Sequence, residues 1–276
     1  MTYKIVADST SNVMSLEKID FSSVPMKIVT DVKEYVDDNR LNTEEMVADL
    51  KAYKGRSGTS CPSIGEWEEA FGDADVVFGV TITSALSGSY GAAMEAKKTY
   101  EENHPSRKVH IIDSLTAGPE MELIIEKLQQ LMLDGKSFEA IREEITAYTQ
   151  RTHTLFSLES LKNLANNGRI NHAVATAAGL LGIRVMGKGS DKGTLELMHK
   201  CRGEKKAMET LFAEMKKMGF KGGKVRISHC FNLNATQSLI DLIRKEFAQA
   251  DIKFCDTTGL CSFYAEKGGL ILGFES

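Results

Sequence analysis

Short apolar runs rich in β-branched residues alternate with longer amphipathic segments through the first half of the chain. Four of these runs have the length and composition of strands: YKIVADS (3–9), SVPMKIVTD (23–31), DVVFGVTIT (75–83) and KVHIIDS (108–114). Strands that alternate with helical segments are typical of a parallel sheet covered by helices. The first half therefore predicts an α/β domain with a parallel sheet and helices on both faces.

Two helices are predicted to close this first half. Apolar residues recur at helical spacing in MELIIEKLQQLMLDG (121–135) and in SFEAIREEITAYTQRT (137–152). We expect Gly135 to end the first helix and Ser137 to begin the second, because these residue types favour those positions.

The second half has a different pattern, in which strand candidates follow one another more closely. The candidates are LGIRVMG (181–187), TLELMHKC (194–201), KVRISHC (224–230), IKFCDTT (252–258) and GGLILGF (268–274). GKGSDKG (187–193) is typical of a hairpin turn, and a helix is predicted over 204–218. We expect a mixed or antiparallel α/β domain here. The domain change lies near residue 150, so that 1–150 and 151–276 form two units.

Composition and charge narrow the classes of partner. The chain has 276 residues, of which 42% are hydrophobic, and this suffices for two domains of ordinary size. Acidic and basic residues are interspersed and the net charge is −4, which argues against nucleic acid and against a polybasic membrane anchor. No apolar run approaches the roughly 20 residues that span a bilayer, and the start of the chain lacks a cleavable hydrophobic segment. We expect a cytoplasmic protein without a stable membrane anchor.

The cysteines favour neither a disulfide framework nor a metal site. They number five, they are scattered, and no two have the CxxC spacing. We predict no metal and no cofactor.

Hydroxyl side chains gather in the loops where an α/β sheet binds its ligands, beyond the carboxyl ends of the strands. These hydroxyls lie in Asp8–Ser11, in Ser84–Ser89, at Ser114, and at Thr59, Ser60 and Ser63. Helix N-termini with short hydroxyl side chains suit an anion such as a carboxylate or phosphate. Serine and threonine are also common helix caps, so the prediction depends on the convergence of several loops.

An enzyme is the alternative class of function. Cys61 precedes a predicted helix, where a thiol pKa can fall, and it could use a distant histidine such as His229. Ser63 and Glu66 form a capping-box pattern that explains the same segment structurally. Ser87 is the first residue of SGSYG, which differs from the GxSxG pattern of hydrolases by having serine at that first position. An enzyme acting on a small anionic substrate, through Cys61, Ser87 or phosphoryl transfer, therefore stays open.

Two arginines in the second half are candidates for contacting an anion. Arg169 follows a glycine at a predicted helix end, and Arg202 follows a predicted strand. The guanidinium group offers fixed donors for a carboxylate, although either residue could equally form a surface salt bridge.

Several motifs, in order and across almost the whole chain, resemble the DegV family. They are DSTS (8–11), TSCPSIGEWEEAF (59–71), TSALSGSYGAA (83–93), IIDSLTAG (111–118), LESLKNLANNGRI (158–170), CRGEKKAMETL (201–211) and GGLILGF (268–274). The resemblance implies a bacterial two-domain α/β protein that holds one long-chain fatty acid between its domains. Many members serve as the carrier subunit of a fatty acid kinase, and a separate ATP-binding subunit makes the acyl phosphate. The resemblance thus implies a lipid-binding carrier that is not itself an enzyme.

The resemblance also assigns roles to matched positions. Thr59 or Ser60 and Ser87 would hold the carboxylate, and Arg169 would support that polar end. The remaining candidates for support are Ser114, Arg202 and Tyr264.

Three positions depart from the family pattern. Cys61 stands where glutamine is frequent, Tyr264 stands where a histidine is common, and 183–185 replace an Ile-Lys-Pro strand end. The loss of the histidine removes a polar group from the head-group network, so the resemblance supports lipid binding more directly than kinase partnership.

Overall fold

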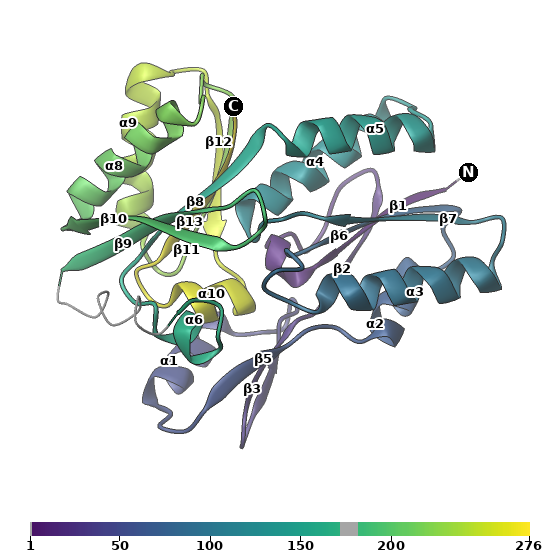
Figure 1. Ribbon diagram of the computed structural model, residues 1–276, viewed down its shortest axis with the longest axis horizontal. Helices are drawn as coiled ribbons and strands as arrows, with labels where there is room; N and C mark the ends of the chain where they lie inside the picture. Colours follow the sequence, from purple (N-terminus) through teal and green to yellow (C-terminus); the bar gives the residue numbers. More distant parts are fainter. Residues whose placement is uncertain (1, 172–181) are drawn as a thin grey trace.

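The computed structural model describes residues 2–171 and 182–276 (Figure 1). Its strands are β1 (Tyr3–Asp8), β2 (Asp20–Val24), β3 (Lys27–Thr30), β4 (Glu34–Val36), β5 (Ser57–Ser60), β6 (Val76–Thr81), β7 (Lys108–Asp113), β8 (Thr152–Leu158), β9 (Ile183–Gly189), β10 (Leu195–Arg202), β11 (Lys224–His229), β12 (Asp251–Asp256) and β13 (Leu270–Glu275). Its helices are η1 (Ser9–Ser11), α1 (Thr43–Ala52), α2 (Ile64–Phe71), α3 (Ser89–Asn103), α4 (Pro119–Leu133), α5 (Phe138–Thr149), α6 (Lys162–Asn166), α8 (Glu204–Lys217), α9 (Leu233–Glu246) and α10 (Gly259–Ala265).

The first sheet has the strand order β2-β1-β6-β7, and every pair in it is parallel. Neighbouring residues of a strand face opposite sides, and β1 shows the result. Ile5 packs in one apolar core with α4 and α5, whereas Val6 packs in another with α2 and α3. The predicted parallel sheet with helices on both faces is confirmed.

The second sheet has the order β10-β9-β8-β13-β11-β12. All its neighbours are antiparallel except β11 and β12, which are parallel. Helices α8 and α9 share an apolar core with this sheet. The predicted mixed α/β arrangement is confirmed, including the hairpin between β9 and β10. Leu181, the first residue of the run predicted over 181–187, lies outside the described residues.

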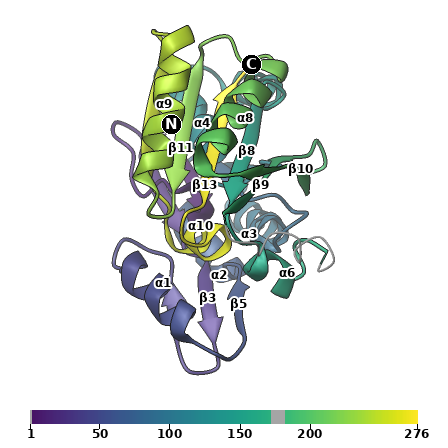
Figure 2. The same ribbon diagram turned by 90° about the vertical axis from the view of Figure 1, so that its left-hand side faces the viewer.

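Helix α4 lies between the two sheets (Figures 1 and 2). It packs against β1 and β6 of the first sheet and against β8, β11 and β13 of the second. Gly273 of β13 permits this approach, since a Cβ atom there would lie 2.5 Å from the backbone nitrogen of Glu120. The two sheets therefore share one buried helix.

A third, small sheet corrects the prediction of one strand over 23–31. The run divides at Pro25, which has no N–H group to donate. Its first part ends β2 in the parallel sheet, and its second part forms β3 in an antiparallel sheet with the order β4-β3-β5. Thr59 and Ser60 belong to β5, so the hydroxyls before helix α2 lie on a strand end.

Helix α10 also joins the two halves. Although it comes near the end of the sequence, it packs against η1, β3 and α1. The parallel sheet lies within residues 3–113 and the mixed sheet within residues 152–275. The domain boundary near residue 150 stays a prediction, because α4 and α10 contact both sides of it.

The predicted helix starts are confirmed by their caps. Ser63 and Glu66 form a reciprocal capping box at α2, and the Ser137 hydroxyl accepts a hydrogen bond from the backbone N–H of Ala140 at α5. In the part of the chain that the structure describes, no helix is long and apolar enough to cross a membrane.

An ion cluster around the buried Arg226 links α4 to the second sheet. Arg226 of β11 is 1% exposed and donates to Glu126 of α4 at 2.6 Å and to Asp251 of β12 at 3.0 Å. Lys253 donates to the other oxygen of Glu126 at 2.7 Å. Burial alone would raise the pKa of Glu126, but the hydrogen bonds from Arg226 and Lys253 lower it to about 2. The carboxylate stays ionised between its cations.

We expect Arg226→Met to lower the free energy of unfolding by about 3 kcal/mol, because it leaves the largely buried carboxylate of Glu126 without its central cation. Urea denaturation measures this loss. Arg40→Met is the matched control, since Arg40 pairs with Asp38 at the surface, and it should leave stability nearly unchanged. Equal stability of the two variants would contradict the role of the cluster.

Candidate functional site

A cavity of about 400 Å³ lies between the first and second sheets. The loops after β1, β6 and β7 form one side of it, and β8, β13 and the β9–β10 hairpin form another. Strand β5, the segment at α6 and helix α10 complete the wall. Most of the lining is apolar, and its volume is in the range of small-molecule sites.

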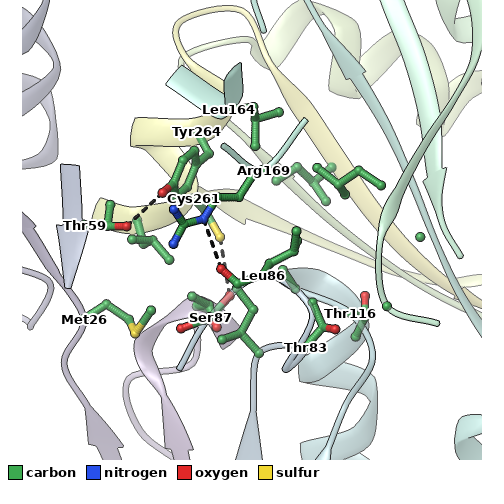
Figure 3. A pocket seen from close by; sticks show the side chains of 18 of the residues that line it. Met26, Thr59, Thr83, Leu86, Ser87, Thr116, Leu164, Arg169, Cys261 and Tyr264 are labelled. Carbon is green, nitrogen blue, oxygen red and sulfur yellow. Dashed lines mark hydrogen bonds between the residues drawn. The ribbon is translucent and has the colours of Figure 1, made fainter. Parts of the chain in front are cut away.

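Polar side chains meet at one end of this cavity (Figure 3). The hydroxyl oxygens of Thr59 on β5 and Tyr264 on α10 lie 2.8 Å apart. Arg169 lies beside them, and its Nε donates to the carbonyl oxygen of Leu86 at 3.1 Å. A second guanidinium nitrogen of Arg169 donates to the carbonyl oxygen of Asn167, so the plane of the group is fixed. We call Thr59, Ser60, Ser87, Arg169 and Tyr264 the polar mouth.

Burial raises the pKa of Tyr264, against smaller opposing effects of Thr59 and Arg169. The phenol is therefore neutral at ordinary pH and can donate one hydrogen bond.

The two serines of the polar mouth have weaker attachments. Ser60 is exposed and its hydroxyl donates to the carbonyl oxygen of Cys61 at 3.2 Å. The hydroxyl oxygen of Ser87 accepts a hydrogen bond from the N–H of Ser89 at 3.2 Å, at the start of α3. Both serines line the cavity with Thr59 and Arg169. The structure thus brings together the hydroxyls and the guanidinium that the sequence analysis had selected.

Two further candidates lie elsewhere. The hydroxyl of Ser114 donates to the carbonyl oxygen of Thr116 at 3.2 Å and so shapes the loop after β7. Arg202 is exposed at the end of β10. Neither is among the described residues that line the cavity, and their supporting roles stay predictions.

The loop after β1 serves mainly to build the fold. Asp8 is fully buried and accepts hydrogen bonds from the hydroxyl of Ser89 at 2.7 Å and from the N–H of Ile82 at 2.8 Å. It also accepts a hydrogen bond from Thr10. Asp8 therefore ties together the loops that carry Ser87 and Thr10, and of the loop's hydroxyls Thr10 lines the cavity.

Cys61 lines the cavity, but the histidine suggested as its partner does not. His229 lies at the end of β11, 3.2 Å from Asp256. No histidine of residues 2–171 or 182–276 is in the cavity lining. Within the described part of the chain, the Ser87 hydroxyl likewise has a backbone N–H as its hydrogen-bond partner, and no base. The described residues also contain no group of three His, Cys, Asp or Glu side chains placed to hold a metal ion.

Asp37, which the sequence analysis missed, positions helix α10. It is 1% exposed and accepts hydrogen bonds from the N–H groups of Gly259 at 2.6 Å and Leu260 at 2.9 Å. The hydroxyl of Ser9 donates to the same carboxylate at 2.8 Å. Burial raises the pKa of Asp37 to about 6, although these hydrogen bonds oppose the rise. No local pattern pairs residues so distant in sequence.

The whole chain matches one protein family. Residues 2–275 match the family described as "Uncharacterised protein, DegV family COG1307". A DegV domain-containing protein of Streptococcus pneumoniae is 44% identical over 279 aligned positions, which cover 100% of this chain and 99% of the relative.

Solved structures agree with this match. A DegV family protein from Eubacterium eligens, loaded with heptadecanoic acid, has a TM-score of 0.98 and 45% identity, with 100% of both chains covered. The Streptococcus pneumoniae Fatty Acid Kinase (Fak) B3 protein, loaded with linoleic acid, has a TM-score of 0.98 and 44% identity. Its comparison covers 100% of this chain and 99% of that chain.

We expect Asp37→Asn to lower the free energy of unfolding by about 1–3 kcal/mol, because an amide NH₂ would face an N–H group of α10. The pH dependence should change as well. Since the folded-state pKa of about 6 is above the ordinary 3.8, stability from this group is present below about pH 4 and is lost as pH rises through about 6. The variant should lack this part of the slope in urea titrations.

Asp73→Asn is the control for this experiment, since the Asp73 side chain is fully exposed. It should keep the slope of the unaltered protein. An Asp37→Asn protein with that same slope would show that Asp37 does not titrate in this range.

Proposed function

The chain belongs to the DegV family, and from this premise we propose that it binds a long-chain fatty acid in the cavity and presents the carboxylate to a separate ATP-dependent kinase subunit. The observation that carries the proposal is an apolar cavity between two sheets with a polar mouth at one end. Two relatives of the same fold, each about as long as this chain, hold heptadecanoic and linoleic acid. One of these relatives is a fatty acid kinase protein by its name.

The energetics favour an acyl chain with an ionised head group. About 15 methylenes at ~0.8 kcal/mol each give a gross ~12 kcal/mol on burial. A buried carboxylate without partners would cost several kcal/mol of this gain. The polar mouth offsets that cost with hydroxyl donors and one guanidinium group.

Each residue of the polar mouth has a specific task in this proposal. Arg169, oriented by the carbonyl oxygens of Leu86 and Asn167, directs charge at the carboxylate. Thr59 and Ser87 donate hydrogen bonds to its oxygens. Tyr264 takes the place of the family's usual histidine and holds the Thr59 hydroxyl at 2.8 Å. The resulting site keeps the carboxylate bound while one of its sides stays open.

Phosphoryl transfer in this proposal takes place on the partner. Ser60 is exposed at the polar mouth, so a kinase subunit can reach the carboxylate without the acyl chain leaving the cavity. The carboxylate oxygen attacks the terminal phosphorus of ATP, ADP departs, and an acyl phosphate forms. A carrier role is favoured over a Cys61 or Ser87 enzyme because no described histidine accompanies either nucleophile in the cavity. A location in the cytoplasm stays a prediction.

Native mass spectrometry and lipid extraction should find one acyl chain bound to the purified protein. After removal of this lipid, we expect Arg169→Ala and Thr59→Val to weaken oleate binding by roughly ten- to a hundredfold, the range for hydrogen bonds to a charged group. Isothermal titration measures the change. Arg40→Ala, at an exposed arginine, is the control.

Cys61→Ala distinguishes the two classes of function. The carrier model predicts fatty acid binding and acyl phosphate formation unchanged in this variant, whereas a thiol enzyme would lose its activity. A protein that neither carries nor binds an acyl chain would overturn the proposed function.

Addition of a fatty acid kinase ATP-binding subunit and ATP should yield acyl phosphate, which hydroxylamine traps as a hydroxamate. We expect Tyr264→Phe to slow this reaction about three- to tenfold, because the Thr59 hydroxyl loses its partner. Tyr53→Phe, at a partly exposed tyrosine that is not among the described residues lining the cavity, should leave the rate unchanged. If the protein binds oleate normally but yields no acyl phosphate, the kinase partnership is contradicted and fatty acid binding is not.

A further inference from the structure

A second group of hydroxyls lies at the other end of the cavity. Thr116 follows β7 and Thr154 lies on β8, and their hydroxyl oxygens are 2.7 Å apart. Both residues line the cavity and both are buried. Figure 3 shows Thr116 and Thr83 on the opposite side of the cavity from Thr59 and Tyr264. The acyl chain would therefore run from one polar end to another.

A buried carboxyl group stands behind these threonines. Glu120, in the first turn of α4, is 6% exposed and accepts a hydrogen bond from the hydroxyl of Thr152 at 2.7 Å. The hydroxyls of Thr154 and Thr116 also oppose part of the rise that burial causes in the pKa of this carboxyl group. Within residues 2–171 and 182–276, no cation forms an ion pair with it, and burial raises its pKa.

A hydrogen bond joins the hydroxyls of Thr116 and Thr154, and one of the two is its donor. Each hydroxyl oxygen has two lone pairs, and this bond uses one of the four. The hydroxyl oxygens of Thr116 and Thr154 then keep lone pairs that can accept a hydrogen bond from the cavity.

Thr83 adds a donor at the same place. It is 1% exposed, and its hydroxyl oxygen accepts a hydrogen bond from the N–H of Ala85 at 3.2 Å. Within the described residues this hydroxyl donates no hydrogen bond of its own. Its backbone N–H donates to the carbonyl oxygen of Thr116 at 2.8 Å, so Thr83 and Thr116 are neighbours in the cavity wall.

The β9–β10 hairpin covers this end of the cavity. Gly193 at its tip has a φ of +74°, and a Cβ atom there would lie 2.0 Å from the Thr83 hydroxyl oxygen. Only a glycine lets the hairpin approach Thr83 and Leu115 so closely. Thr83 lines the cavity, so a polar group on the ligand can satisfy this donor, whereas an unsubstituted acyl chain would leave it unpaired.

We propose that this end of the cavity binds a hydroxyl group carried on the acyl chain, so that the ligands of this protein include hydroxy fatty acids. The proposal rests on the proposed function, since it assumes that a fatty acid occupies the cavity. A ligand hydroxyl donates to the oxygen of Thr116 or Thr154 and accepts from Thr83. A keto group can only accept, and an unsubstituted chain can do neither.

The test compares octadecanoic acid with its 10-hydroxy, 12-hydroxy and 18-hydroxy derivatives on lipid-free protein. For each protein, the affinity for a hydroxy acid is divided by that for octadecanoic acid. Comparing this ratio between proteins cancels the different solubility of the two ligands in water. We expect Thr154→Val and Thr83→Val to lower this ratio roughly three- to tenfold for at least one hydroxy acid. Thr116→Ser, which keeps a hydroxyl, should preserve the ratio.

Thr152→Val is the matched control. It removes a buried threonine hydroxyl that is hydrogen-bonded to Glu120, but Thr152 is not among the described residues that line the cavity. It should leave the ratio unchanged even if it lowers the unfolding temperature.

Ratios equal across the unaltered protein, Thr154→Val and Thr83→Val would overturn this inference and leave the proposed function intact. A fall in the ratio for Thr152→Val as large as that for Thr154→Val would also overturn it, because the network and not the ligand would then explain the effect. Binding of none of the four acids would overturn both proposals.

Discussion

The cavity depends on the docking of helix α10 into the first half of the chain. The helix comes from the last part of the sequence, yet its N-terminal N–H groups point at Asp37, a buried carboxylate from the loop after β4. A carboxylate at a helix N-terminus is favoured by the free N–H groups and by the helix dipole. Since α10 carries both Cys261 and Tyr264 into the cavity wall, this interaction sets the distance between Tyr264 and Thr59.

The distribution of hydroxyl groups has a common physical cause. An apolar cavity between two sheets must end where loops and strand ends expose polar atoms, and each such atom needs a partner. At one end, the partners are Arg169, Tyr264 and the proposed carboxylate. At the other end, Thr116 is paired with Thr154 and Thr152 with Glu120, and Thr83 keeps a donor. The same short side chains therefore serve as caps, as ties between loops and as ligand contacts.

Much of the fold could be predicted from the sequence, because the runs around Ile5 and Phe78 carry the strong apolar signal of buried parallel strands. The small β4-β3-β5 sheet was missed, since its strands are short and only partly buried and Pro25 divides an apolar run. The polar mouth was found through hydroxyl loops and motif resemblance. Asp37 was missed because its partners lie more than 200 positions away, and Glu120 has the sequence context of an ordinary acid in a first helical turn.

The position of α4 between the sheets has a consequence for how the protein folds. A domain can normally fold by itself when its helices cover only its own sheet. Helix α4 instead completes the apolar core of the first sheet and also packs against β8, β11 and β13 of the second. Each sheet thus shields one face of α4 from water. We infer that the two sheets unfold as one cooperative unit, because an isolated first half would expose the face of α4 that packs on β8, β11 and β13. Evolutionary exchange of either half alone is correspondingly constrained.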